Sequence, residues 1–297
     1  MCYLFRTIGT VSHPSNNALS ATSGTFTGAF TSLGIDDNAD ATAITIDSSE
    51  HVGIGIADPD GTLHVHSASA GSVTPQTDSD DLVVENNGHG GISVLTPDAN
   101  RSAIVFGHAS DNLKMQIRHD GGTSLSQIIS DDTLTFNVSG GTERMRIDTN
   151  GHITMPTQTA FGAIGSSAPT MPINTTYVLP LDTERFDQNG DYNTSNYTFT
   201  APVTGRYQLN GSIYLYNYLD TSAGYIMFTL RTSNDEYQYP VQASMFGSDI
   251  GSFGMNISHL VDMDASDTAV IDIFQQAGAA QTSISGGHSH FTGFLVA

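Results

Sequence analysis

The sequence has no tryptophan, one cysteine (Cys2) and one lysine (Lys114) among its nine basic residues. A single cysteine cannot form an intramolecular disulfide, so disulfides cannot stabilise the fold. Thirty acidic residues give a net charge of −21, whereas nucleic acids and anionic membranes bind clustered basic side chains. No apolar run approaches the roughly 18 residues of a transmembrane helix, and no signal-peptide pattern opens the chain. We therefore expect neither a nucleic-acid partner nor membrane insertion.

Helix-forming residues are also scarce. Leu, Glu, Lys and Arg are outnumbered by Thr, Ser, Gly, Asn and Asp mixed with Val, Ile and Phe, a composition typical of strands and turns. Charged residues make up only 13% of the chain, which is not the composition of a disordered acidic tail. A chain of 297 residues can form about two domains of ordinary size. The predicted fold class is all-β.

Aromatic residues are unevenly distributed. Ten of the eleven tyrosines and eight of the fourteen phenylalanines follow residue 170. Because aromatic side chains bury large areas, this predicts a compact domain over residues 156–297, here called the head. Residues 31–155, here called the stalk, have few large side chains, which favours an elongated, intertwined β-structure that shares its core with neighbouring chains. Residues 1–30 are then a docking segment.

An internal repeat supports hairpins in the stalk. Residues 44–52 (ITIDSSEHV) match residues 145–153 (MRIDTNGHI), and each segment predicts two short strands joined by a turn that begins at an aspartate. Further alternating segments predict strands within residues 81–85, 103–106, 114–118 and 133–138.

Part of the stalk resembles a known group of proteins. Residues 51–59 (HVGIGIADP), followed by 63–65 (LHV), and residues 141–151 (GTERMRIDTNG) are similar to segments of tail-fibre and appendage proteins of bacteriophages, especially marine ones. Residues 25–31 (TFTGAFT) are similar to their shaft tracts. The resemblance implies a virion protein, although this stalk is short for a long fibre.

The head has a second resemblance. Residues 197–209 (YTFTAPVTGRYQL), 264–273 (DASDTAVIDI) and 291–297 (FTGFLVA) are similar in order and spacing to the complement-type, tumour-necrosis-factor-like jelly roll. This resemblance implies a ten-strand sandwich that forms a homotrimer. Short strand segments separated by turns independently favour an all-β sandwich.

No arrangement of residues indicates catalysis, and we expect a binding protein that is not an enzyme. No Gly-x-Ser-x-Gly motif is present, and Gly53-Ile54-Gly55 lacks the later glycine of a phosphate-binding loop. Receptor contacts are predicted in two segments that mix aromatic and polar residues and are expected to be loops at the tip of the head, since loops vary on a rigid scaffold. Their candidate residues are Asp235, Glu236, Tyr237, Tyr239, Phe246 and Phe253. Tyr214, Tyr216 and Tyr218 alternate along one strand and favour a trimer interface, or alternatively a sugar-stacking surface.

Two His-x-His pairs are candidate metal ligands. His288 and His290 precede the closing strand and, if extended, point to the same side, so three copies around an axis would offer imidazoles to an octahedral transition metal. Such pairs in some phage fibre tips hold iron. His64 and His66 have the same spacing and are the weaker candidate. Solvated loop histidines are the simpler interpretation of both pairs.

Calcium is a further candidate cofactor. It could bind Asp262, Asp264 and Asp267, although capping of a turn is the preferred interpretation of these acids. Residues 36–40 resemble half of a calcium loop, for which an Asx-turn is the simpler explanation.

The combined interpretation is a virion structural protein. We expect a homotrimeric tail fibre or tailspike-like adhesin that docks on other phage tail or capsid proteins and attaches to a host surface glycan or protein through its head. The alternatives are a capsid decoration or collar protein of the same particle, and a bacterial surface lectin or adhesin.

Overall fold

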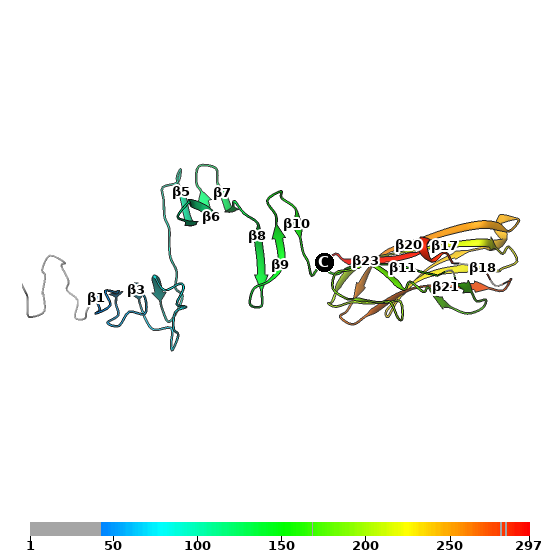
Figure 1. Cartoon of the computed structure of the whole chain (residues 1–297), viewed down its shortest axis with the longest axis horizontal. Helices are drawn as coiled ribbons and strands as arrows, with labels where there is room; N and C mark the ends of the chain where they lie inside the picture. The colour runs from blue at the N-terminus through cyan, green and yellow to red at the C-terminus, as the bar shows by residue number, and fades with distance from the viewer. Residues whose placement is uncertain (1–42, 168, 280, 283) are drawn as a thin grey trace, which may run out of the picture. The chain divides into compact units, whose positions relative to one another are not determined.

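The computed structural model describes residues 43–167, 169–279, 281–282 and 284–297 (Figure 1). The chain divides into two compact units, residues 1–95 and 96–297. The described residues form strands, turns and two short 3-10 helices, which agrees with the all-β prediction. None of these helices is long and apolar enough to cross a membrane. The predicted docking segment 1–30 and the acidic segment 36–40 lie outside the described residues.

The first unit contains one four-stranded sheet. Its strands, in spatial order, are β1 (Ile44–Ile46), β2 (Val52–Ile54), β3 (Leu63–His66) and β4 (Leu82–Glu85). Strands β1 and β2 form an antiparallel hairpin, whereas β2, β3 and β4 run parallel. Glycine is required where the crossovers pack closely: Gly55 has φ +76°, and a Cβ at Gly61 would collide with the Asp80 carbonyl oxygen.

The rest of the stalk forms two antiparallel three-stranded sheets. Their strands are β5 (Arg101–His108), β6 (Asp111–Asp120) and β7 (Leu125–Ser130), and β8 (Leu134–Val138), β9 (Thr142–Ile147) and β10 (Ile153–Thr154). All four additional segments predicted as strands lie within or overlap β4, β5, β6 and β8. Exposed and partly buried side chains alternate along these strands, and no second layer of buried side chains covers either sheet among the described residues.

The internal repeat forms the same turn twice. In the first copy the Asp47 carboxylate accepts the backbone N–H groups of Ser49 and His51 at 2.8 and 2.9 Å. In the second, Asp148 accepts those of Asn150 and His152 at the same two distances. The fourth residue of the turn has positive φ in both copies, and it is Glu50 in the first and Gly151 in the second. Glycine adopts this conformation without strain. The predicted hairpins are confirmed, and the aspartate is what closes them.

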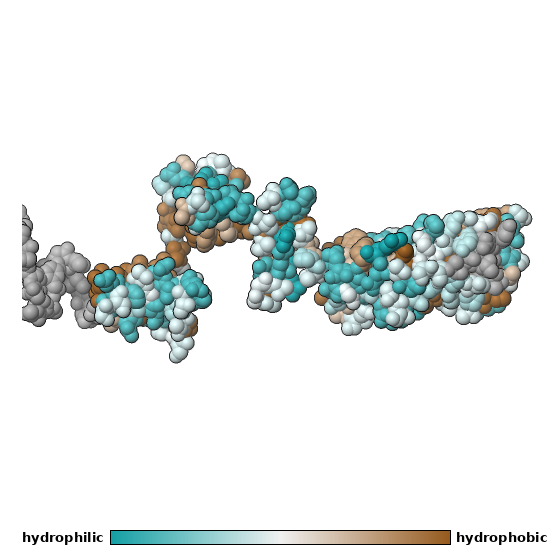
Figure 2. Space-filling model, in the orientation of Figure 1, coloured by the Kyte–Doolittle hydropathy of each residue, from teal (hydrophilic) through white to brown (hydrophobic). Residues whose placement is uncertain are grey.

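The described stalk has almost no interior. Its buried residues are Gly53, Pro59, Gly61 and His64. By contrast, large apolar side chains stay exposed along its strands, including Ile46, Phe106, Ile128 and Phe136. Figure 2 shows the hydrophobic surface that results around β5–β7.

The head is a sandwich of two sheets. One has the order β14-β11-β23-β17-β20, and the other the order β15-β16-β21-β18-β19 with β13 pairing to β21. A separate pair joins β12 and β22. The strands are β11 (Ala160–Ile164), β12 (Thr170–Met171), β13 (Tyr177–Val178), β14 (Thr183–Asp187), β15 (Tyr192–Asn193), β16 (Thr198–Thr200), β17 (Gly205–Leu219), β18 (Tyr225–Thr232), β19 (Glu236–Val241), β20 (Ile250–Met263), β21 (Thr268–Gln276), β22 (Gln281–Thr282) and β23 (His290–Leu295).

Aromatic side chains fill the space between the two sheets. The Phe161 ring lies 4.7 Å from Phe199, 5.3 Å from Tyr192 and 5.0 Å from Phe291, measured between centroids. Tyr192 donates its hydroxyl to the Leu181 carbonyl at 2.8 Å, so burying this ring leaves no polar atom unpaired. Every buried hydrophobic residue of the described chain lies between Phe161 and Phe291, which agrees with the core predicted from the aromatic distribution.

Candidate functional site

The prediction that the six candidate receptor-contact residues lie in loops is wrong for most of them, while their contact with a receptor stays a prediction. Glu236–Val241 is strand β19, an edge strand in which Glu236 pairs with Arg231 and Tyr237 with Leu230. The turn before β19 ends at Asp235, because the Thr232 N–H donates to the Asp235 carbonyl at 2.8 Å. The alternating segment after this turn therefore continues as a strand.

The second predicted loop, residues 246–253, is also shorter than expected, because both of its ends belong to regular elements. Phe246 ends a 3-10 helix (η1, Ala243–Phe246), and Phe253 lies within β20. Their rings are 5.5 Å apart in an edge-to-face arrangement. Only residues 247–249 connect the two elements.

The two predicted segments lie at opposite ends of the sandwich. Beside the β18–β19 turn, the Ser233 N–H donates to the Thr268 carbonyl, and Thr268 follows β20 at the end where Met263 pairs with Gly205. The other segment precedes the start of β20, where Ile250 pairs with Leu219 at the far end of β17. The two segments therefore cannot form one tip, which differs from the arrangement that the sequence predicts.

The side chains of β19 are divided between the two faces of its sheet. Tyr237 points inward, where its ring stacks on His259 at 4.3 Å. Tyr239 is half-exposed at the sheet edge. Glu236 and Gln238 point to the opposite, outer face.

A groove of about 500 Å³ runs over this outer face. Cross-strand register places Asp272, Thr229 and Gln238 in one row across β21, β18 and β19, with Arg231 and Glu236 in the next. Tyr225 and Phe274, whose ring centroids are 5.8 Å apart, belong to the other half of the groove. Thr176 and Met227 complete the lining. One half of the groove is thus aromatic and the other polar.

Asp272 is the electrostatic centre of the polar half. It is 2% exposed, and the Arg231 Nε donates to its Oδ2 at 2.7 Å. Burial raises the pKa of the Asp272 carboxyl above its usual value, and the Arg231 guanidinium only partly offsets this effect. With Glu236 nearby, the polar half contains two carboxylates and one guanidinium. This arrangement offers hydrogen-bond donors and acceptors but no surplus positive charge.

The tyrosine row belongs to the other sheet. Tyr214 and Tyr216 are partly buried and alternate with the buried Ile213 and Leu215 of β17, which confirms that they share a face. That face points away from the sandwich core, and the side chain of Tyr218 lies outside the described part. The row is therefore not part of the groove.

The head histidines do not share one extended segment. His288 ends a 3-10 helix (η2, Gly286–His288), and its Nδ1 is 2.8 Å from the Ser285 hydroxyl. His290 is exposed at the start of β23. The period-two argument for a shared side therefore does not apply to this pair.

Of the three acids considered for calcium, Asp267 holds a turn together. Asp267 accepts the Asp264 N–H at 2.8 Å and the Ser233 hydroxyl at 2.8 Å. Asp262 lies 3.7 Å from the Arg206 Nε. The preferred interpretation, capping of a turn, is confirmed for Asp267.

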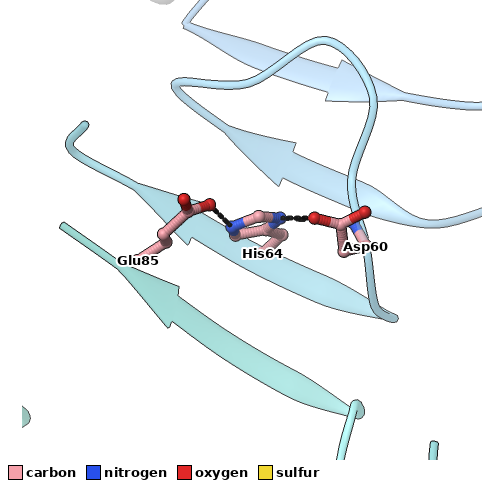
Figure 3. A group of neighbouring side chains, drawn as sticks. All are labelled: Asp60, His64 and Glu85. Atoms are coloured by element: carbon pink, nitrogen blue, oxygen red, sulfur yellow. Dashed lines mark hydrogen bonds and ion pairs between the residues drawn. The ribbon is translucent and has the colours of Figure 1, made fainter. Parts of the chain in front are cut away.

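His64 and His66 both approach one carboxylate. The Nε2 atoms of His64 and His66 lie 3.2 and 3.9 Å from the Glu85 Oε2, because β3 and β4 are parallel and Glu85 is the register partner of His66. Asp60 lies beside the Nδ1 of His64 (Figure 3). The Ala70 N–H, donated to Glu85 Oε1 at 2.6 Å, is the main cause that lowers the pKa of the Glu85 carboxyl. Glu85 is therefore an oriented, ionised carboxylate at neutral pH.

Sequence reasoning missed the central residues of both sites. Asp272 and Arg231 come from different strands, and their pairing required the register of β18 with β21. Glu85 is about twenty residues from His64 and meets it only through a parallel crossover. The available signal was an isolated charge inside an apolar strand, as in Val270-Ile271-Asp272-Ile273.

Comparison with known proteins gives structural likenesses only. No family model and no curated protein matches the sequence. The globular domain of a zebrafish complement 1qA protein is 16% identical, with a TM-score of 0.37 over 47% of this chain and 98% of that one. Murine APRIL at pH 8.0 is 8% identical (TM-score 0.35; 47% and 99%). The Eiger TNF of S. frugiperda is 15% identical (TM-score 0.35; 47% and 93%). The strand order and register given above define the sandwich independently of these matches.

Proposed function

We propose that the chain is a non-enzymatic, homotrimeric attachment protein of a virion, a short tail fibre or tailspike-like adhesin whose head binds a glycan of the host surface. The observation that carries this proposal is the contrast within one chain. The head has a complete core and a solvent-facing groove, whereas the stalk exposes its apolar residues.

The composition of the stalk strands supports the proposed association of chains. Ile104, Phe106 and Ile117 are between 46% and 50% exposed on the β5–β7 sheet. Exposed apolar surface of this kind marks an interface, since its burial contributes about 25 cal/mol per Å². A fibre in which several chains cover one another's strands would bury these residues. The number three is the one implied by the resemblance of the head sequence to trimeric jelly rolls.

The groove chemistry favours a sugar ligand. Pyranose rings present C–H faces that pack on aromatic rings such as Tyr225 and Phe274, and hydroxyls that bond to carboxylates, amides and guanidinium groups such as Glu236, Gln238 and Arg231. Arg231 is already paired with Asp272, and the chain has a net charge of −21. Anionic sugars would be repelled. We therefore propose a neutral glycan.

Attachment then relies on several weak sites. Three heads on a fibre, and several fibres on a particle, raise the effective concentration of each further contact once the first has formed. A shallow groove with modest affinity is sufficient under these conditions.

A glycan array probed with the full chain tests the recognition site. We expect binding to neutral glycans that is lost in Gln238→Ala and Tyr225→Ala, two groove variants. Met245→Ala, 78% exposed on η1, should bind normally and is the matched control. Equal binding by the groove variants and the wild type would place recognition elsewhere, and binding to host proteins alone would exclude a glycan.

Immunogold electron microscopy of particles tests the location. We expect label at the tail or its appendages. Label over the capsid shell or at the collar would support the decoration or collar alternatives, and label only on bacterial surfaces would support a lectin or adhesin. Release of reducing sugars from host polysaccharide would contradict the absence of enzymatic activity.

A further inference from the structure

The guanidinium group of Arg231 is held by only one of its edges in the polar half of the groove. Its Nε donates to the Asp272 Oδ2 at 2.7 Å, and the Asp272 side chain is almost completely buried. An arginine presents five N–H donors in a rigid, planar fork, so this bond leaves the four donors on Nη1 and Nη2. Arg231 is 38% exposed, and among the described residues these two nitrogens form no hydrogen bond. Asp272 therefore orients a fork whose outer edge a ligand can reach.

Glu236 lies beside Arg231 and is held by a different partner. The two residues are register partners on β19 and β18, and both line the groove. The Glu236 Oε2 accepts the Gln238 Nε2–H group at 2.9 Å. The groove therefore presents a pair of guanidinium donors next to a carboxylate acceptor, and each of the two groups is oriented from its own side.

This arrangement restricts the chemical class of the ligand. Two parallel N–H donors match two neighbouring oxygen atoms, as in a carboxylate, a phosphate or a vicinal diol. Asp272 and Glu236 outnumber Arg231 in charge, and the chain has a net charge of −21, so both anionic groups are disfavoured. A hydroxyl accepts from Arg231 and can also donate to Glu236, which an ionised carboxylate cannot do. A vicinal diol therefore satisfies the donors and the acceptor together.

We propose, on the basis of the glycan-binding function proposed above, that Arg231 and Glu236 select glycans with a vicinal diol, two hydroxyls on adjacent carbon atoms of one sugar ring. The hydroxyl oxygens accept from Nη1 and Nη2 of Arg231, and one hydroxyl donates to the Glu236 carboxylate. Because Asp272 and Gln238 already hold these side chains in place, binding costs little side-chain entropy. A sugar without adjacent hydroxyls leaves one arm of the fork unpaired, which lowers its affinity. Arg231 is therefore the specificity-determining residue of the groove.

Binding of the full chain to polymers that carry α-linked glucose, galactose or mannose tests the proposal. Each polymer is compared with two analogues that lack one hydroxyl of the same sugar. Removal of the hydroxyl at C3 destroys both vicinal diols of the ring, C2–C3 and C3–C4, whereas removal at C6 leaves both intact. For each parent sugar that binds, the 3-deoxy analogue should bind at least about tenfold more weakly, and the 6-deoxy analogue within about threefold of the parent.

Arg231→Lys tests the fork itself. Lysine keeps the positive charge and a donor for Asp272 but offers a single ammonium group in place of two parallel donors. This variant should bind the parent polymers about tenfold more weakly than the wild type does. It should bind the parent and 3-deoxy polymers alike, because the diol has lost its partner. The matched control is Arg206→Lys on β17, whose side chain is 66% exposed with its Nε 3.7 Å from Asp262, and it should keep the wild-type preference.

A second variant keeps the test independent of the folding of Arg231→Lys. Glu236→Ala, at an exposed position, leaves the pairing of Arg231 with Asp272 intact and should also reduce the preference for the parent over the 3-deoxy polymer. The proposal is overturned if no parent polymer binds, if the 3-deoxy analogues bind as well as their parents, or if both variants keep the wild-type preference. In these cases, binding of other neutral glycans on the array would leave the proposed function standing, and absence of all glycan binding would remove both.

Discussion

The stalk and the head are built from strands with similar alternation, but the apolar faces of those strands have different surroundings. In the head, the inward faces of two sheets meet, so that Phe161 and Phe199 are fully buried. In the described stalk, each sheet is a single layer, and Phe106 and Phe136 remain 50% and 42% exposed. The same pattern of residues thus gives a self-sufficient domain in one region and an incomplete one in the other.

This difference shows that alternation alone does not create a core. A sheet buries its apolar face only when a second layer covers it. The head supplies both layers from one chain, with long strands such as β17 and β20. The described stalk sheets have no second layer of their own, although β6 is ten residues long, and we propose that other chains supply it.

The largest expected effect is on the head core. Phe199→Ala should lower the free energy of unfolding of the head by about 3–5 kcal/mol, because the lost ring leaves a cavity beside Phe161 and Tyr207. Thermal or urea unfolding of the full chain, followed by tyrosine fluorescence, measures this effect. Met245→Ala, on an exposed side chain, should change it by no more than about 0.5 kcal/mol. Equal effects of the two substitutions would contradict the account of the head core.

The second prediction concerns a stalk phenylalanine. Phe106→Ala would cost little in a separate chain, since the ring is 50% exposed. If association covers β5, the substitution should instead speed proteolysis within residues 96–155 and leave the unfolding of the head unchanged. Limited proteolysis with mass-spectrometric mapping of the cleavage sites distinguishes the two cases. An unchanged cleavage pattern would argue that this face is not covered.

The structure also shows which features the sequence could predict. The aspartate-led hairpins and the core of the head follow from local patterns: a turn residue at a fixed offset, and aromatic residues that alternate with polar ones. The many polar residues of Asp235–Tyr239 favour a loop, yet the segment alternates as an edge strand does, and residues 236–241 form β19. The groove and the Glu85–His66 contact depend on strand register and on a parallel crossover, which no local pattern encodes.

A third prediction concerns the pH dependence of stalk stability, which we expect to differ from that of the head. The pKa of the Asp148 carboxyl is lowered, first by its bond to the His152 side chain, so its contribution to stability is present above the usual value of 3.8 and is lost as the pH falls through the folded-state pKa. Asp148→Asn should therefore lower the melting temperature of the stalk at neutral pH, and the deficit should shrink below pH 3.8. Circular dichroism melts across pH measure it. Asp47→Asn, in the equivalent turn, should behave alike, and a deficit independent of pH would contradict the charge-based explanation.

The smallest expected effect is that of replacing Asp272, whose pKa is shifted in the opposite direction to that of Asp148. The pKa of the Asp272 carboxyl is raised by burial, so the stability linked to this group is present below the usual value of 3.8 and is lost as the pH rises through the folded-state pKa. Asp272→Asn should leave the head equally or slightly more stable at neutral pH, because Arg231 is 38% exposed and water can solvate it. The difference should vanish in acid. A marked loss of stability at neutral pH would show that the ion pair is worth more than the burial of its charge costs.

The mass of the full chain in solution tests the central claim most directly. Size-exclusion chromatography with light scattering should give roughly 94 kDa, three times the 31.4 kDa of one chain. The mass should stay constant on dilution, since the stalk faces are proposed to be buried between chains. A stable, folded monomer of about 31 kDa with a protease-resistant stalk would contradict the account, because the exposed stalk strands would then need no partner.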